Sequence, residues 1–336
     1  SDVTDMAVAS DGSIYVVDAQ GNRFLKAAAG GRSFTDLTAG LVAAGYTAPA
    51  RLVAVAPDNP NVVAIVDSIA AVAGTSAAGQ VYLSTDGGVT WAALPLVPDT
   101  AVGNNSVRDV AVSPAVPGAA LGRHYAVAVS DDLVNSTTDG AMFVLGPTLA
   151  FAIPAGLPAL NTYDFTSVAF SPNYVGDRTL VGVASDAVTN DTFLCMYNTL
   201  TGANILPADQ VIETVTSDSP DDYDVANAAT HIISSDIALP SDFDPTIVTG
   251  RRVYVGWNAN GAAVNRDVYR IDNISVYKLG IAADIAIHSV SYSGTCTSGY
   301  LVAGEAAVTA AAFVNAWYSE NPQTTAPVWS VSLKPP

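Results

Sequence analysis

The feature that most constrains this chain of 336 residues is an internal repeat of about 56 residues. Each copy opens with an apolar strand that runs into Ser-Pro or a related turn. A second apolar strand follows, and a third strand, a tight turn and a fourth strand complete the copy. The turns that end the first strands are spaced by 47, 57, 58, 68 and 54 residues, at Ser10, Pro57, Pro114, Pro172, Pro240 and Gly294. A repeat of this length built from short strands is typical of a β-propeller, in which each blade is a four-stranded sheet.

Six copies predict an all-β chain that folds as one six-bladed β-propeller domain with four-stranded antiparallel blades. The blades are expected at about residues 1–46, 47–104, 105–160, 161–230, 231–282 and 283–336. The alternating, β-branched pattern excludes helical repeats, and the 26 Gly and 19 Pro residues supply the many turns that this fold needs. Because the chain begins at Ser1, we expect a processed chain or a piece of a longer one, and a seventh blade outside it is the alternative.

One hairpin of the second copy has a specific motif. Its residues follow the spacing S-x-D-x-G-x-T-W and are Ser84, Asp86, Gly88, Thr90 and Trp91. The aspartate is suited to accept backbone N–H groups across the turn, the glycines permit positive φ, and the tryptophan is placed to fill the space between two blades. The motif resembles the Asp-box, or BNR repeat, of sialidase-like β-propellers of the kind found in bacterial cell-surface proteins. The resemblance implies a structural hairpin between the two outer strands of a blade.

Two other segments extend this resemblance. The turn at Ala29-Gly30-Gly31, followed by Ser33-Phe34, aligns with the motif but has Ala29 in place of the aspartate, so it is a degenerate copy. The phrase S-P-N-Y…D-R-T-L, from Ser171 to Leu180, is similar to a phrase of bacterial surface proteins that contain Asp-box propellers. In those proteins it links the first two strands of a blade.

The charge balance restricts the partners of the chain. It has 31 acidic and 13 basic residues and a net charge of −18. We expect neither nucleic acid nor an anionic membrane surface as a partner, because phosphate groups are bound by Lys and Arg, which are few here. No apolar run approaches the roughly 18 residues that span a bilayer, so we expect no membrane insertion within this chain. The acidic, Lys-poor composition favours an extracellular or cell-surface location, although halophilic adaptation gives a similar bias.

The sequence assigns no catalytic residue. Catalytic sialidases of this fold use an arginine triad, a Tyr–Glu pair and an acidic acid/base residue, but this chain has only three Glu residues and lacks the Arg-Ile-Pro segment. Other Asp-box propellers hydrolyse β-glucans with two aspartates, which are effective as acid and base only at a suitable separation. Polar residues here end the second strands at Asp18, Asp67, Asp131, Asp186, Asn258 and Glu305. Since that position follows the repeat, we interpret these residues as caps of turns.

The sequence contains one candidate metal site and several candidate modification sites. The loop at residues 217–224 contains Asp218, Asp221, Asp222 and Asp224, whose oxygens would suit calcium, the one cofactor considered. The spacing is not that of an EF-hand, so a solvated acidic loop is the preferred interpretation. Acceptor sequences for N-glycosylation occur at Asn104, Asn135, Asn190 and Asn273. Two cysteines, Cys195 and Cys296, leave both a disulfide and free thiols open, and the scattered histidines give no support for zinc.

These observations favour a non-enzymatic extracellular protein. It would be the propeller subunit of a cell-surface assembly such as a surface layer, sheath or filament, with copies of itself or other surface proteins as partners. The alternative is a carbohydrate-binding or glycoside-hydrolysing propeller that acts on glycans at one mouth of its channel. A third hypothesis is an assembly factor inside the cell, since some photosystem assembly factors resemble this fold.

Overall fold

The computed structural model describes twelve segments of the chain, which group into two compact units. Unit 1 comprises Ser1–Asp132 and Thr138–Pro154, and unit 2 comprises Leu133–Thr137 and Ala155–Pro336. The described residues are 3–46, 49–67, 77–98, 106–130, 140–154, 163–186, 192–206, 210–211, 231–260, 266–281, 285–306 and 314–332.

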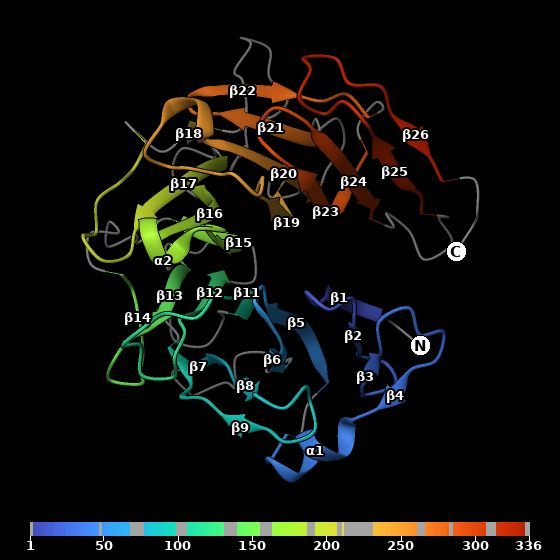
Figure 1. Cartoon of the computed structure of the whole chain (residues 1–336), viewed down its shortest axis with the longest axis vertical. Coiled ribbons are helices and arrows are strands. Elements are labelled where there is room, and N and C mark those ends of the chain that lie inside the picture. The colour runs from blue at the N-terminus through green and yellow to red at the C-terminus, as the bar shows by residue number, and fades with distance from the viewer. Residues whose placement is uncertain are drawn as a thin grey trace. The chain divides into compact units, whose positions relative to one another are not determined.

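Six four-stranded antiparallel sheets follow one another along the chain, three in each unit (Figure 1). These sheets are the blades of a six-bladed β-propeller, which confirms the predicted fold class. In every blade the strands are neighbours in the order in which the chain forms them.

Unit 1 contains blades 1 to 3. Blade 1 consists of β1 (Val3–Val8), β2 (Ile14–Asp18), β3 (Arg23–Ala27) and β4 (Thr35–Asp36). Blade 2 consists of β5 (Ala50–Ala56), β6 (Asn59–Asp67), β8 (Val81–Ser84) and β9 (Ala92–Ala93). A separate pair joins β7 (Ala77–Gly79) to β10 (Val97–Pro98). Blade 3 consists of β11 (Ser106–Val112), β12 (Tyr125–Ser130), β13 (Ala141–Leu145) and β14 (Phe151–Ala152).

Unit 2 contains blades 4 to 6. Blade 4 consists of β15 (Tyr163–Phe170), β16 (Thr179–Asp186), β17 (Thr192–Asn198) and β18 (Gln210–Val211). Blade 5 consists of β19 (His231–Ala238), β20 (Arg252–Asn260), β21 (Val268–Asp272) and β22 (Ser275–Lys278). Blade 6 consists of β23 (Ile287–Gly294), β24 (Gly299–Glu305), β25 (Ala316–Ser319) and β26 (Ser330–Val331).

The second strand of a blade is buried on both faces where blades lie on both of its sides. In β6, Val63 and Ile65 pack with the residues of blade 1, while Ala64 and Val66 pack with those of blade 3. All four side chains are at most 1% exposed. This double burial explains why the second strands are nearly continuous apolar runs rather than half-polar alternations.

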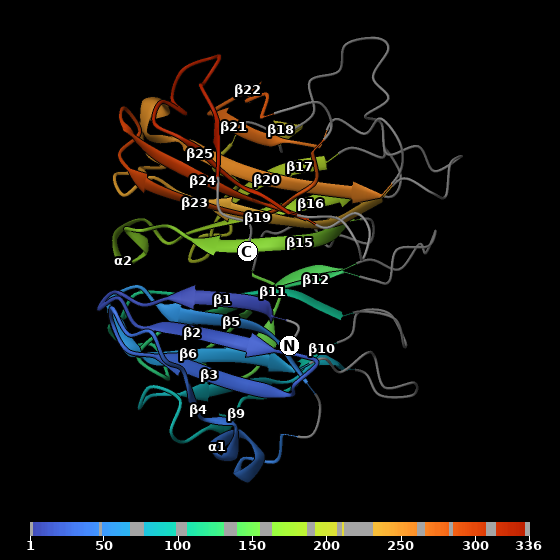
Figure 2. The same cartoon turned by 90° about the vertical axis from the view of Figure 1, so that its right-hand side faces the viewer.

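Helices are few and short in the described chain. They are α1 (Thr38–Ala43), α2 (Tyr174–Asp177) and the 3₁₀ turn η1 (Val248–Gly250). Figure 2 shows α1 beyond the outer strands β4 and β9 of unit 1. Its Leu41 is fully buried there, and Gly40 lies so close to the carbonyl of Val89 that a Cβ atom would collide with it. In the described residues no helix is both long and apolar enough to span a bilayer.

A β-bulge recurs in the first strand of all six blades. The register shifts at Val3/Asp5, Ala50/Leu52, Val107/Asp109, Phe165/Ser167, Ile232/Ser234 and Ile287/Ser289. An extra residue on one strand redirects the side chains beside it and frees a backbone group from the ladder. The bulge therefore provides an N–H group that a neighbouring blade can bind.

Candidate functional site

The five motif residues of blade 2 form one hydrogen-bonded hairpin between β8 and β9. Asp86 Oδ1 accepts from Ser84 Oγ at 2.8 Å and from Thr90 N at 2.9 Å, and its Oδ2 accepts from Thr90 Oγ1 at 2.5 Å. Ser84 Oγ in turn accepts from Gly88 N at 2.8 Å. Desolvation raises the pKa of Asp86, but the donors of Thr90, Ser84 and Val89 outweigh it and lower this pKa to about 2.

The same hairpin connects blade 2 to blade 1 through Trp91. Its Nε1 donates to Gly88 O at 3.0 Å, and its ring meets the ring of Phe24 edge-on, with 5.1 Å between the centroids. Gly88 has φ +93°, and a Cβ atom there would lie 2.6 Å from the Phe24 ring. The hairpin thus holds two blades together, and the polar side-chain atoms of Ser84, Asp86, Thr90 and Trp91 bond within the turn.

The carboxylates at the ends of the second strands also have turn contacts. Asp18 accepts from Gly21 N at 2.9 Å and from Arg23 at 2.7 Å, and Asp67 accepts from Gln80 N at 3.2 Å. Glu305 accepts from Asn315 N at 3.0 Å and from its Nδ2 at 2.8 Å. Asn258, at the matching place in β20, is 7% exposed. The side chains of Asp131 and Asp186 lie outside the described residues.

Two first-strand aspartates link adjacent blades, which the sequence analysis did not foresee. Asp5 Oδ2 accepts from Val53 N of blade 2 at 2.8 Å, and Asp236 Oδ2 accepts from Val290 N of blade 6 at 2.8 Å. Both donor residues, Val53 and Val290, follow the bulge of their own strand. The sequence signal is the recurrence of Asp before an apolar-Ala-apolar triplet, at residues 5–8, 109–112 and 236–239.

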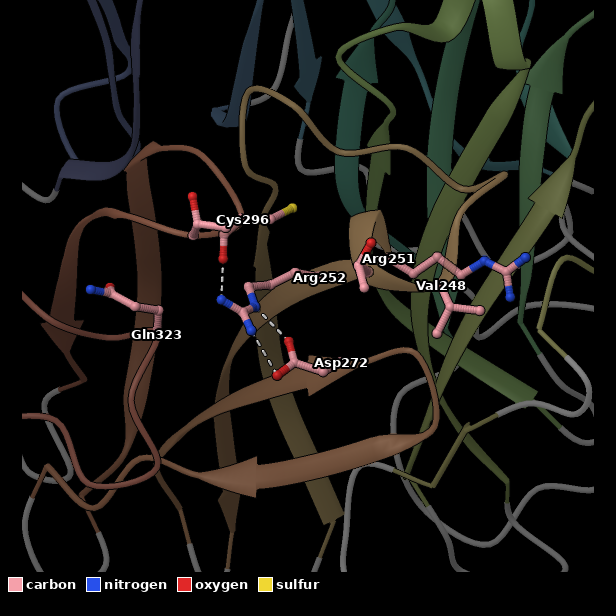
Figure 3. A pocket seen from close by; sticks show the side chains of 8 residues that line it. Val248, Arg251, Arg252, Asp272, Cys296 and Gln323 are labelled. Atoms are coloured by element: carbon pink, nitrogen blue, oxygen red, sulfur yellow. Dashed lines mark hydrogen bonds and ion pairs between the residues drawn. The ribbon is translucent and has the colours of Figure 1, made fainter.

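A pocket of about 480 Å³ opens where blade 5 meets blade 6 in unit 2 (Figure 3). Its lining combines charged, polar and apolar groups from η1, the ends of β20 and β21, and two loops of blade 6. The lining residues are Val248, Thr249, Arg251, Arg252, Asp272, Cys296, Thr297 and Gln323.

Arg252 lies at the centre of this pocket. Its Nε donates to Asp272 Oδ1 at 2.5 Å, its NH2 donates to Asp272 Oδ2 at 2.9 Å, and its NH1 donates to the carbonyl of Cys296. Burial lowers the pKa of Arg252, but Asp272 outweighs this effect and holds the pKa above its ordinary value. Figure 3 shows Arg252 between Asp272 and Cys296, with the Arg251 guanidinium directed away from both.

A second arginine, Arg270, also binds the carboxylate of Asp272. Arg270 is 3% exposed, and its Nε donates to Asp272 Oδ2 at 3.0 Å. Its NH1 donates to Pro322 O at 3.1 Å and to Thr324 O at 2.6 Å, so it also fixes the blade 6 loop that carries Gln323. Two guanidinium groups therefore share one carboxylate, and this cluster has a surplus positive charge.

Arg251 forms the rim of the pocket. Its Nε donates to Pro245 O at 2.6 Å and its NH1 donates to Asn273 Oδ1 at 3.0 Å. Asn273 has φ +56° at the turn between β21 and β22. It is one of the four predicted glycosylation positions, and the other three, Asn104, Asn135 and Asn190, lie outside the described residues.

The thiol of the pocket is not a nucleophile at neutral pH. Burial, reinforced by Asp242, raises the pKa of Cys296 to about 12. Its Sγ donates to Gly250 O at 3.6 Å, and both Cys296 and Cys195 are buried free cysteines. The pocket thus offers charged and polar groups that bind, while its thiol stays protonated.

The described residues contain no group of three or more His, Cys, Asp or Glu side chains placed to hold a metal ion. The calcium candidates Asp218, Asp221, Asp222 and Asp224 lie outside the described part of the chain, so that prediction stays a prediction.

Comparison with known proteins gives structural neighbours only. Hydrazine synthase of Kuenenia stuttgartiensis is similar with a TM-score of 0.56 and 12% identity, over 90% of this chain and 76% of that one. YCF48 from Cyanidioschyzon merolae is similar with a TM-score of 0.52 and 12% identity, over 99% of this chain and 85% of that one. No family model and no curated protein matches the sequence. At this identity the similarity shows the fold alone.

The pocket residues were missed by the sequence analysis, which searched for carboxylate pairs and motifs. A charge map would have found them. Four of the 13 basic residues fall between 251 and 270, at Arg251, Arg252, Arg266 and Arg270. In a chain with a net charge of −18, such local enrichment breaks the repeat and indicates a specialised site.

Proposed function

We propose that this chain is a non-enzymatic extracellular protein that binds other polypeptides as the propeller subunit of a cell-surface assembly. A surface layer, sheath or filament is the expected form, with copies of itself or other surface proteins as partners. In this proposal the Ser84–Trp91 hairpin is an Asp-box of the sialidase-like kind, with a purely structural role.

The chemistry of the blade 5–6 pocket carries the proposal. Its Arg252 guanidinium stays charged, its Asp272 carboxylate is bound by two arginines, and the pKa of its Cys296 thiol is about 12. General acid–base catalysis needs a group that exchanges a proton near the working pH, and an arginine does not. A charged donor in a preformed pocket supports recognition instead.

The charge of the chain supports the extracellular part of the proposal. A net charge of −18 with few lysines keeps a protein soluble and disfavours nucleic acid as a partner. It also means that copies repel one another over most of their surface. Association of copies then requires a local positive site, which the arginine cluster provides.

Electron microscopy of the protein isolated from its source, without added ligand, tests this proposal. We expect an ordered lattice or fibre in which this chain is the repeating unit. Dispersed particles that bind or cleave a glycan would contradict it and favour the carbohydrate hypothesis. A glycan screen with the Asp67→Asn variant would then establish whether a strand-end carboxylate takes part.

A further inference from the structure

We propose that the blade 5–6 pocket is a peptide-carboxylate site, in which Arg252 binds an aspartate or glutamate side chain of a partner polypeptide. This inference rests on the proposed binding role and names the chemical group that the pocket recognises.

The first step concerns the hydrogen-bond donors of Arg252. A guanidinium has five N–H groups. Two bind Asp272 and one binds the carbonyl of Cys296, which leaves two within the part of the chain that the structure describes. The side chain is 17% exposed and lines the pocket, so solvent and ligands reach it. Guanidinium N–H groups match the geometry of a carboxylate better than that of a neutral acceptor.

The second step concerns charge. Arg252 and Arg270 share Asp272, so these three groups together carry one surplus positive charge. Other charges lie close by: Arg251 forms the rim, and Asp242 accepts from the backbone N–H of Cys296 at 2.6 Å. Because Asp242 limits the positive potential, a single carboxylate fits the site better than a dianionic phosphate.

The third step identifies a polypeptide rather than a simple acid. Gln323 lines the pocket, and its Oε1 is buried without a hydrogen-bond partner among the described residues. A buried acceptor without a partner is unfavourable unless a ligand or water donates to it. A peptide carries a carboxylate for Arg252 and an amide N–H for Gln323. Figure 3 shows the Gln323 amide turned away from Arg252, so the side chain has to rotate toward the pocket to accept that N–H. Val248, 60% exposed at the rim, offers apolar contact for the neighbouring residue of the peptide.

Calorimetric titration of the dispersed protein tests the assignment with three probes. They are a blocked tripeptide with a central aspartate, the same peptide with asparagine, and succinate. We expect the aspartate peptide to bind at least about tenfold more tightly than the asparagine peptide, and this difference to shrink in high salt. Equal binding of the two peptides would overturn the carboxylate assignment. Succinate binding as tightly as the aspartate peptide would overturn the assignment to a polypeptide.

Two variants and one control separate binding from folding. Arg252→Gln should weaken the aspartate peptide by at least about tenfold. Gln323→Met should weaken both peptides without affecting succinate, and it removes a buried oxygen that has no partner, so it should not destabilise the fold. The control is Arg123→Gln, since Arg123 also joins an aspartate and a backbone carbonyl but lies in unit 1. Unchanged peptide binding in both pocket variants would refute the site.

The outcome is independent of the assembly experiment. Peptide binding is measured on dispersed protein. If no peptide binds but a lattice or fibre is seen, the pocket assignment is rejected and the structural role is kept. A missing lattice with intact peptide binding would instead reject the structural role and keep the site.

Discussion

The two compact units differ in how many of their buried side-chain polar atoms have no hydrogen-bond partner among the described residues. In unit 1 the described residues leave Thr4 Oγ1 buried without a partner. In unit 2 several such atoms lie in blades 5 and 6, among them Ser234 Oγ, Trp257 Nε1, Asp267 Oδ2, Trp317 Nε1 and Gln323 Oε1. Each such atom is unfavourable unless a donor or acceptor satisfies it, so the proposed binding role fits unit 2 better than unit 1.

Two arginines at joints between blades differ in a similar way. Arg123 of blade 3 pairs with Asp58 of blade 2 and donates to the carbonyl of Ser113 at 2.9 Å. Arg252 pairs with Asp272 within blade 5 and donates to the carbonyl of Cys296 in blade 6. Only Arg252 of the two lines the 480 Å³ pocket. Both arginines thus bind an aspartate and a carbonyl, but the ion pair crosses the joint only for Arg123, and only Arg252 lies at the pocket.

The largest effect is expected from Asp267→Asn in unit 2. Asp267 is fully buried, its Oδ1 accepts from Val268 N at 2.7 Å and from Ile281 N at 3.1 Å, and its Oδ2 has no partner among the described residues. Burial raises the pKa of Asp267 to about 6, despite these two donors. The amide keeps an acceptor and carries no charge, but its NH2 group adds two buried donors, so we expect the free energy of unfolding near neutral pH to rise by at most about 2–3 kcal/mol.

The raised pKa of Asp267 also determines the direction in which the stability of the protein changes with pH. Since the folded state binds the Asp267 proton more tightly than the unfolded state does, the stabilising protonation is complete below about pH 4. It is lost as the pH rises through about 6. Urea unfolding between these two pH values should show stability falling with pH in the natural protein and a flatter profile in the variant. A variant with the same slope as the natural protein would contradict the assignment.

The second prediction concerns the hydrogen bonds of the blade 2 hairpin in unit 1. Asp86→Ala removes the acceptor of Thr90 N and Oγ1 and of Ser84 Oγ, so we expect a loss of about 1–2 kcal/mol, as for the removal of a capping side chain. Because the pKa of Asp86 is lowered, its contribution is lost as the pH falls from about 4 toward 2, opposite in sense to that of Asp267. Chemical denaturation measures the loss, and Thr90→Val serves as the smaller, matched change.

The third prediction tests whether the joints between blades are otherwise equal. Asp5→Ala in unit 1 and Asp236→Ala in unit 2 each remove one carboxylate acceptor from a bulge N–H group at 2.8 Å. We expect similar losses of about 1–2 kcal/mol in both variants, measured by denaturant unfolding. A clearly larger loss in unit 2 would show that its joints, and not only its pocket, differ from those of unit 1.

The sequence predicted the blades because each copy repeats the same alternation and the same turn anchors. The fixed spacing of the motif also predicted a tight turn at Asp86, and in the structure Asp86 accepts from Thr90 N there. The pocket could not be predicted in this way. Arg252, Asp272 and Gln323 come from three separate segments, and only the packing of blade 6 on blade 5 brings them together. The bulges could not be predicted either, because no particular residue type marks the extra residue of a bulged strand.

The smallest effect is expected from restoring the missing aspartate in blade 1. In the blade 2 hairpin two successive glycines have positive φ, +77° at Gly87 and +93° at Gly88, and the amides that follow point to Asp86. In blade 1 only Gly30 of the turn has positive φ, and Gly31 N donates to Ala28 O at 2.8 Å. An aspartate at the exposed position of Ala29 therefore meets a different backbone, and we expect Ala29→Asp to change the free energy of unfolding by less than about 0.5 kcal/mol. A gain of about 1 kcal/mol or more in denaturant unfolding would show that the degenerate turn adopts the blade 2 geometry once its acceptor is restored.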